Sequence, residues 1–298
     1  MPNRKKILLS DLSLLIVAAM WGGGFSFTKN ILQYVTPLYY LSARFLLAAA
    51  ILGIIFYPKV KRANRLDIKN SMTVGIFLMM AFSTQTIGLQ FTTPGKQAFI
   101  TSAYVVMIPF LSFMVSKYLP SKKEIAGAVL CMIGLSLLSI TREMSINIGD
   151  VLTLVSAFFF AGHIVSIGVY ANRINTMVMN VYQFLLAGIG CGILAYLIEP
   201  VPTTLALPAV YSLAYLVVFS TIGAFMIQVT AQKYTYPTHA GIILSLEAVF
   251  GALFAYIFWS ETFTTQMILG CTIIFIAILV TEVKFSKEKE VIPAQTGL

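Results

Sequence analysis

Apolar stretches long enough to cross a lipid bilayer recur along the whole chain of 298 residues. The hydrocarbon core of a bilayer is about 30 Å thick, so a helix of about 20 apolar residues spans it. Hydrophobic residues make up 58% of the sequence and charged residues only 10%, whereas a soluble domain has roughly 45–50% and 25%. A soluble fold cannot bury that much apolar surface, and the sequence predicts an all-α integral membrane protein.

Helix boundaries follow from hydropathy, with proline, glycine and charge clusters as separators. Proline stands at four predicted helix starts, where its missing backbone N–H costs nothing; these are Pro37, Pro94, Pro208 and Pro237. The first apolar run is too long for a signal peptide and lacks a cleavage site, so we expect an uncleaved first span. Ten transmembrane helices are predicted, over residues 10–29, 37–57, 69–90, 95–117, 123–141, 149–172, 178–198, 208–232, 238–259 and 264–283.

The net charge of +9 comes from basic residues clustered at the ends of apolar segments, an arrangement that argues against nucleic-acid binding. Cytoplasmic loops accumulate Lys and Arg, so this distribution orients the bundle. With the N-terminus inside, the predicted outer loops hold only Lys29, Lys96 and Arg142. We therefore expect both termini inside the cell, with residues 285–298 as a cytoplasmic tail.

A weak internal repeat appears when the chain is shifted on itself by 143 residues. The identical pairs are Gln85/Gln228, Thr92/Thr235, Pro94/Pro237, Ile100/Ile243, Ser102/Ser245, Val106/Val249, Gly127/Gly270 and Ile133/Ile276. The alternative is chance similarity among apolar helices. If the repeat is real, residues 1–142 and 143–284 form two five-helix halves, and the odd number of spans inverts the second half. Inverted repeats place a binding site near the membrane midplane, between the halves.

Glu247 lies near the middle of the ninth predicted span. A charged residue there costs about 2.5–3.5 kcal/mol on insertion scales, so Glu247 is expected to face a wet cavity, find a partner or bind a proton. The repeat pairs Glu247 with Tyr104, which then faces the same central space. Both are candidate substrate-binding residues, with Ser102 and Ser245 beside them. The alternatives are a neutral Glu247 bonded to a neighbouring helix and serines that serve only helix packing.

Four other polar or aromatic residues within the spans are candidates for the same cavity. Trp21 lies at the centre of a span rather than at the membrane interface, which favours a cavity-lining role. His163 could titrate near neutral pH or be a packing residue with satisfied hydrogen bonds. Arg44 could contact substrate, anchor its helix or extend outward to the interface. Gln85, with its equivalent Gln228, could gate the cavity or bridge helices.

The sequence lacks the motifs of the common nucleotide-driven and hydrolytic machines. It has no G-x-x-x-x-G-K-[ST] phosphate loop, so ATP-driven pumping by this chain alone is excluded, and no H-E-x-x-H or G-x-S-x-G motif. Cys131, Cys191 and Cys271 lie inside apolar segments, where cysteine mostly packs as a small hydrophobe. We expect no catalytic residues, no metal site and no cofactor.

The segment from Pro237 to Glu282 resembles the second half-repeat of the drug/metabolite transporter superfamily, in its EamA-type branch. Trp21-Gly22, Arg44-Phe45, Glu247 and Ser260-Glu261 correspond to recurrent features of that branch. The usual pattern has proline where this chain has Ala248, and a Gly-Glu pair where it has Ser260-Glu261. The resemblance covers nearly the whole chain and implies ten spans in two inverted repeats.

The resemblance also implies a secondary transporter in a bacterial cytoplasmic membrane that exports small metabolites such as amino acids or related amphiphiles. Transport would proceed by proton antiport or by facilitated diffusion, by a monomer or a homodimer, and Glu261 is expected to be structural. A channel or lipid scramblase is the alternative. It would need a continuous polar path or a groove open to lipid, and no helix carries a strong polar stripe. An intramembrane enzyme is a third class, for which His163 has no evident nucleophile partner.

Overall fold

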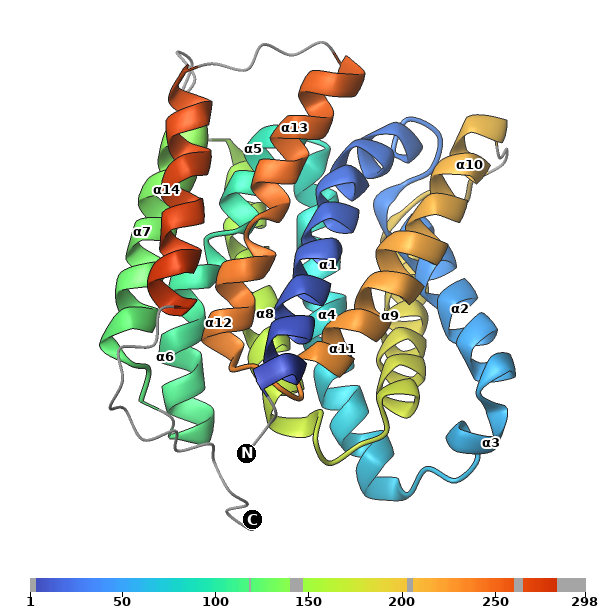
Figure 1. Ribbon diagram of the computed structural model, residues 1–298. Helices are drawn as coiled ribbons and strands as arrows, with labels where there is room; N and C mark the ends of the chain where they lie inside the picture. The colour runs from blue at the N-terminus through green and yellow to red at the C-terminus, as the bar shows by residue number, and fades with distance from the viewer. Residues whose placement is uncertain (1–3, 118, 140–146, 203–205, 260–264, 283–298) are drawn as a thin grey trace.

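The computed structural model describes residues 4–117, 119–139, 147–202, 206–259 and 265–282, and in these ranges the chain forms helices and no strands (Figure 1). The helices are α1 (Arg4–Ile31), α2 (Pro37–Ile55), α3 (Tyr57–Val60), α4 (Arg65–Leu89), α5 (Pro94–Thr101), α6 (Tyr104–Ser116), α7 (Lys122–Ser139), α8 (Ile148–Tyr170), α9 (Thr176–Ile198), α10 (Leu207–Tyr215), the π-helix η1 (Leu216–Gly223), α11 (Ala224–Ala231), α12 (Pro237–Leu244), α13 (Glu247–Trp259) and α14 (Thr265–Glu282).

Eight segments of the described chain are long and apolar enough to cross a membrane. They are α1, α2, α4, α5 with α6, α8, α9, α10 through α11, and α12 with α13. The two remaining predicted spans correspond to α7 and α14, helices of 18 residues each that pack against one another. The all-helical membrane architecture is therefore confirmed, and the count of ten spans stays a prediction.

Helix starts are fixed by local chemistry that the sequence displays. Pro37, Pro94 and Pro237 are the first residues of α2, α5 and α12, where no intrahelical N–H is needed. Asn147 caps α8: its side chain accepts from the Asp150 N–H at 3.1 Å, while Asp150 accepts from the Asn147 N–H at 2.9 Å. Asn64 and Asp67 form the same capping box at the start of α4.

Two of the predicted spans are broken in the middle, which the hydropathy did not indicate. α5 ends at Thr101 and α6 begins at Tyr104; α12 ends at Leu244 and α13 begins at Glu247. At both breaks the backbone bonds tighten from i→i+4 to i→i+3, as in Val105 N–H to Ser102 O and Ala248 N–H to Ser245 O. The second break forms although Ala248 stands where proline is usual in the family.

Corresponding elements follow one another at the 143-residue offset. α5 and α12 have eight residues each, α6 and α13 have 13, and α7 and α14 have 18, with each pair starting and ending at equivalent positions. The breaks meet, because the Ser102 hydroxyl oxygen lies 3.4 Å from the Ser245 carbonyl oxygen. Equal lengths and equal break points make chance similarity a poor explanation of the sequence repeat.

The packing has the same two-fold character. α2 packs on its equivalent α9, and α7 packs on its equivalent α14. α4 packs on α8, and the equivalent of α4, the α10–α11 segment, packs on the equivalent of α8, which is α1. In Figure 1, α5 lies at the top with α6 below it, whereas α12 lies low with α13 above it, so the broken helices run in opposite directions. The two halves are arranged as inverted copies.

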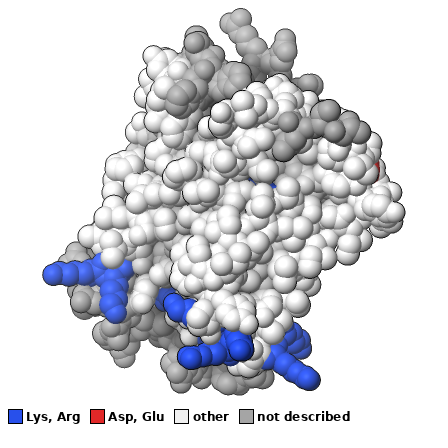
Figure 2. Space-filling view, turned by 90° about the vertical axis from the view of Figure 1, so that its right-hand side faces the viewer, with Lys and Arg blue, Asp and Glu red and all other residues white. Residues whose placement is uncertain are grey.

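Basic side chains gather at one end of the molecule. The face in Figure 2 shows Lys and Arg at its lower end, the end at which α1 begins in Figure 1, and above them a wide surface almost without charged side chains. This one-sided distribution is what the positive-inside rule describes for a membrane protein. The inward orientation of that end stays a prediction.

Candidate functional site

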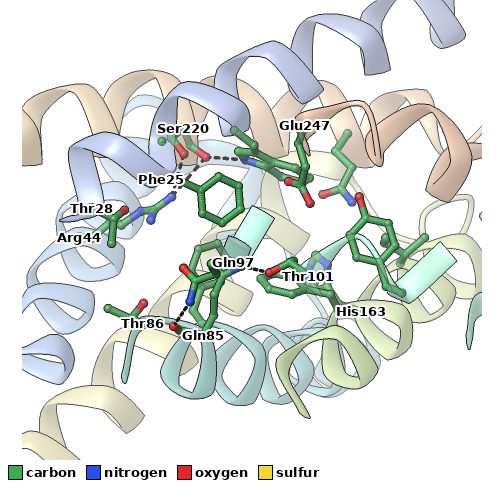
Figure 3. Close-up of a pocket in the computed structure, with 17 residues that line it drawn as sticks. Phe25, Thr28, Arg44, Gln85, Thr86, Gln97, Thr101, His163, Ser220 and Glu247 are labelled. Carbon is green, nitrogen blue, oxygen red and sulfur yellow. Dashed lines mark hydrogen bonds between the residues drawn. The ribbon is translucent and has the colours of Figure 1, made fainter. Parts of the chain in front are cut away.

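A pocket at the centre of the bundle is walled by both halves of the chain (Figure 3). It encloses about 600 Å³ of space free of protein atoms, counted with its opening. The lining residues are Trp21, Gly24, Phe25, Thr28, Arg44, Phe82, Gln85, Thr86, Gln97, Thr101, Tyr104, Phe160, His163, Ile164, Ser220, Gln228 and Glu247. Aromatic and aliphatic groups with a few convergent polar groups are typical of a small-molecule site.

Six of the eight residues that the sequence nominated lie in this one pocket: Glu247, Tyr104, Trp21, His163, Arg44 and Gln85. The other two, Ser102 and Ser245, lie at the helix breaks, where their hydroxyls donate to the carbonyls of Ala98 at 3.0 Å and Ile242 at 2.7 Å. These contacts agree with the alternative that the two serines serve helix packing. A role in substrate binding stays a prediction for all eight.

The π-helix η1 builds the surroundings of Arg44. Nε of Arg44 donates to the Thr221 hydroxyl at 2.6 Å, Nη1 donates to the Tyr40 hydroxyl at 2.8 Å, and Nη2 donates to the Ser220 hydroxyl at 3.0 Å. The guanidinium carbon lies 4.8 Å from the ring centroid of Phe82. Arg44 is buried and points into the bundle, so the outward extension considered from the sequence is wrong. The inward direction gives each of its three nitrogens a hydrogen-bond acceptor, which lipid could not do.

Trp21 connects α1 to the same π-helical turn. Its indole Nε1 donates to the Ser220 carbonyl at 2.9 Å, and its ring centroid lies 5.2 Å from that of Phe225. A π-helix displaces carbonyls from the regular i→i+4 ladder and makes them available as acceptors, which is one reason for its frequent use at functional sites. Phe82 and Phe225, whose centroids are 6.2 Å apart, occupy equivalent positions in the two halves.

Glu247 and Tyr104 begin the second segments of the two broken helices. Glu247 Oε1 and the Tyr104 hydroxyl are both buried, and neither has a hydrogen-bond partner among the described residues. Glu247 is 4% exposed and Tyr104 is 2% exposed, so neither group is satisfied by bulk water. In Figure 3, the Glu247 side chain points into the pocket. The breaks therefore deliver the Tyr104 hydroxyl and a carboxyl oxygen of Glu247 to the centre of the bundle without a hydrogen-bond partner among the described residues.

His163 is held by a chain of side-chain amides on α9. His163 Nε2 lies 2.9 Å from Gln183 Oε1, Gln183 Nε2 donates to Asn180 Oδ1 at 2.7 Å, and Asn180 Nδ2 donates to the Thr176 carbonyl at 3.0 Å. The Thr176 carbonyl can only accept a hydrogen bond, which fixes the orientation of the Asn180 amide and then that of the Gln183 amide. Gln183 therefore presents its oxygen to His163, and Nε2 of His163 carries the hydrogen. His163 thus lines the pocket and is also a bonded packing residue.

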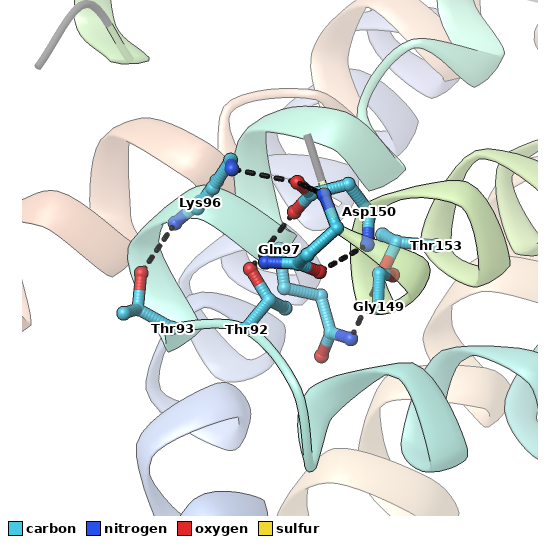
Figure 4. A network of polar contacts seen from close by, with 8 residues as sticks. Thr92, Thr93, Lys96, Gln97, Gly149, Asp150 and Thr153 are labelled. Atoms are coloured by element: carbon cyan, nitrogen blue, oxygen red, sulfur yellow. Dashed lines mark hydrogen bonds and ion pairs between the residues drawn. The ribbon is translucent and has the colours of Figure 1, made fainter. Parts of the chain in front are cut away.

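An ion pair connects α5 to α8 at the end of the molecule where both helices begin (Figure 4). Lys96 Nζ lies 2.6 Å from Asp150 Oδ2, and the Thr92 hydroxyl donates to Asp150 Oδ1 at 3.0 Å. At the opposite end His239, the equivalent of Lys96, lies 3.4 Å from Asp11 on α1. The first contact joins the first turn of α5 to the start of α8, and the second joins the first turn of α12 to the N-terminal half of α1. In both, a broken helix contacts the first helix of the other half.

Several lining residues were not nominated from the sequence, among them Thr28, Gln97, Thr101 and Phe160. Small hydroxyls and phenylalanines are common in membrane helices, so their presence carried no signal. Gln228 is different, because the repeat had already named it as the equivalent of Gln85.

The residues that the structure describes include no group of three or more His, Cys, Asp or Glu side chains that could hold a metal ion. Cys131 and Cys191 are buried, and Cys131 Sγ lies 2.9 Å from the Ser245 hydroxyl. Glu261, for which the sequence predicted a structural role, lies outside the described residues, as does Ser260.

A bundle of membrane-length apolar helices, built from two inverted halves around a central polar pocket, defines a membrane transport protein. The chain belongs to the EamA-like transporter family, whose model matches residues 8–140 and 147–283. The family resemblance read from the sequence is confirmed, and the chain is a multi-pass membrane transporter.

Relatives extend over almost the whole chain. An uncharacterized transporter of Archaeoglobus fulgidus is 32% identical over 283 residues, which are 94% of this chain and 87% of the relative. The uncharacterized transporter YoaV of Bacillus subtilis is 21% identical over 290 residues, 93% of this chain and 98% of the relative. A crystal structure with 15% sequence identity superposes with a TM-score of 0.76 over 94% of this chain and 97% of the other, which shows the same fold.

Proposed function

We propose that the protein is a secondary transporter that exports small amphiphilic zwitterions, such as amino acids with apolar side chains, through the central pocket. The observation that carries this proposal is the pair of isolated ionisable groups in the pocket. No carboxylate in the described part of the chain forms an ion pair with Arg44, and Glu247 has no basic partner there. A ligand with a carboxylate and an amine complements both groups, and the Trp21, Phe25, Phe82 and Phe160 rings complement an apolar body.

The transport cycle follows from the inverted halves. The protein has ten spans, with residues 1–142 and 143–284 as the two halves and α7 and α14 as the fifth span of each. Both termini face the cytoplasm of a bacterial cell. Rocking of one half against the other exposes the pocket to each side in turn. Competition between a proton and the substrate amine for Glu247 couples export to proton entry.

The test is ligand-induced thermal stabilisation, because a ligand that binds only the folded state raises its melting temperature. The compounds are L-phenylalanine, L-leucine, phenethylamine and 3-phenylpropionate, which share an apolar body and differ in charged groups. The zwitterions should raise the melting temperature most, and Trp21→Ala or Tyr104→Ala should weaken that effect without loss of expression. Equal stabilisation by the single-charge analogues would refute the zwitterion assignment.

Transport by alternating access is tested separately in proteoliposomes. Unlabelled L-phenylalanine on one side should accelerate the exit of labelled L-phenylalanine from the other, since only a carrier shows such counterflow. Flux without trans-stimulation would instead identify a channel. Movement of labelled lipid between leaflets would identify a scramblase.

A further inference from the structure

The side chain of Gln228 is the one pocket-lining amide of the described residues with no hydrogen bond at either end. Gln228 lies on α11 and is 0% exposed, and both Oε1 and Nε2 are buried without a partner among the described residues. A buried amide that gives up its bonds to water without replacing them destabilises the folded protein. Such groups are rare in native proteins, and each one calls for a specific explanation.

The equivalent residue in the first half, which also lines the pocket, has a hydrogen-bond partner within the protein. Gln85 on α4 donates from Nε2 to the Thr101 hydroxyl on α5 at 3.0 Å. The position equivalent to Thr101 is Leu244, whose side chain can neither donate nor accept. The second half therefore retains the glutamine and lacks the hydroxyl, which leaves the amide facing the pocket.

We infer that Gln228 is a specificity-determining residue that hydrogen-bonds the transported molecule. This inference rests on the proposed function. An amide offers a donor and an acceptor side by side, so it matches a ligand end that carries both. The ammonium and carboxylate of an amino acid, or a carboxamide, satisfy both atoms. A simple amine satisfies only Oε1 and a simple acid only Nε2, and a site with unpaired polar groups rejects such ligands.

The first experiment needs no ligand. Gln228→Met keeps the length of the side chain and removes the amide. Gln232→Met is the matched control, because Gln232 lies one turn further along, outside the pocket, and donates to the Ile164 carbonyl at 3.0 Å. We expect Gln228→Met to melt at or above the wild-type temperature and Gln232→Met to melt below it. A melting temperature of Gln228→Met below that of the wild type would overturn the inference.

The second experiment measures affinity from the dependence of the melting temperature on ligand concentration. Gln228→Met should bind L-phenylalanine at least tenfold more weakly than the wild type, while Gln232→Met stays within twofold. The preference for L-phenylalanine over phenethylamine should fall in Gln228→Met, a readout that a purely structural role would not move. Wild-type affinity and preference in Gln228→Met would overturn the inference.

The two proposals fail in different ways. If none of the four compounds stabilises the wild type, the zwitterion substrate class of the proposed function is wrong. The ligand-free comparison then decides the status of Gln228 by itself: a melting temperature at or above that of the wild type supports a group reserved for a ligand, and a lower one refutes it.

Discussion

Gly22 allows α1 to lie directly against the turn of α13 that carries Glu247. A Cβ atom built on Gly22 would lie 2.8 Å from the Glu247 carbonyl oxygen and 2.7 Å from Phe250 Cβ. Contacts of that length force a backbone to move, because neither neighbour is the flexible end of a side chain. The position of the Glu247 carboxyl in the pocket thus depends on the absence of a side chain on α1.

Gly22→Ala is expected to destabilise the protein by about 1–3 kcal/mol, the usual cost of overpacking a core. It should also weaken ligand stabilisation, because α13 must shift. Gly95→Ala is the control, since a Cβ at Gly95 meets nothing within 4 Å. Thermal unfolding of both variants checks the prediction. Equal melting temperatures for the two variants would show that the α1–α13 contact is loose.

Glu247→Gln tests the proton-binding role of the carboxyl group. The amide keeps the size of the side chain but cannot exchange a proton, so labelled L-phenylalanine flux in proteoliposomes should no longer respond to an imposed pH gradient. The variant should fold normally, because it buries no charge. Flux with a wild-type response to the gradient would leave Glu247 as a packing residue and make His163 the next candidate.

At the scale of helices, sequence could locate the elements but not their interruptions. Hydropathy placed each span because lipid solvation acts on whole segments. It missed the breaks after Thr101 and Leu244 and the π-helix from Leu216 to Gly223, because hydropathy averages over a whole segment and carries no signal of a local change in backbone hydrogen bonding. The direction of Arg44 stayed open at the level of sequence, because its acceptors Thr221 and Ser220 lie far away in the chain.

The ion pair between Lys96 and Asp150 should couple α5 to α8. Asp150 is 7% exposed and Lys96 is 31% exposed, so the pair is only partly screened by solvent. In a double-mutant cycle of Lys96→Met and Asp150→Asn, we expect a coupling free energy on the order of 1 kcal/mol in thermal unfolding. Additive effects of the two substitutions would show that the helices are held by other contacts.

At the scale of the whole molecule, the orientation in the membrane can be measured by labelling. With Cys131, Cys191 and Cys271 replaced, Gly95→Cys should react in intact cells with an impermeant thiol reagent, and Arg62→Cys should not. Gly95 lies in the first turn of α5, and Arg62 lies between α3 and α4 at the other end of the bundle. The reverse pattern would place the termini outside.

The architecture was more predictable from sequence than the pocket. Lipid imposes the same requirement on every span, and the eight identities at the 143-residue offset were enough to indicate two halves. Glu247 and Trp21 could be nominated because such residues are unusual at membrane depth, and Tyr104 because the repeat pairs it with Glu247. Thr28 and Gln97 could not, because their place in the pocket depends on how helices from both halves meet.

The matched helix breaks have a consequence for the alternative conformation of the molecule. Because α5, α6 and α7 agree in length and end points with α12, α13 and α14, each backbone angle of these three helices has a defined partner in the other half. Exchanging the angles of residue n with those of residue n + 143 over these helices generates a second arrangement, in which the broken helices of the two halves have traded conformations. The described conformation therefore predicts a second one. Distances between spin labels at the two ends of the bundle can be calculated for both conformations before they are measured.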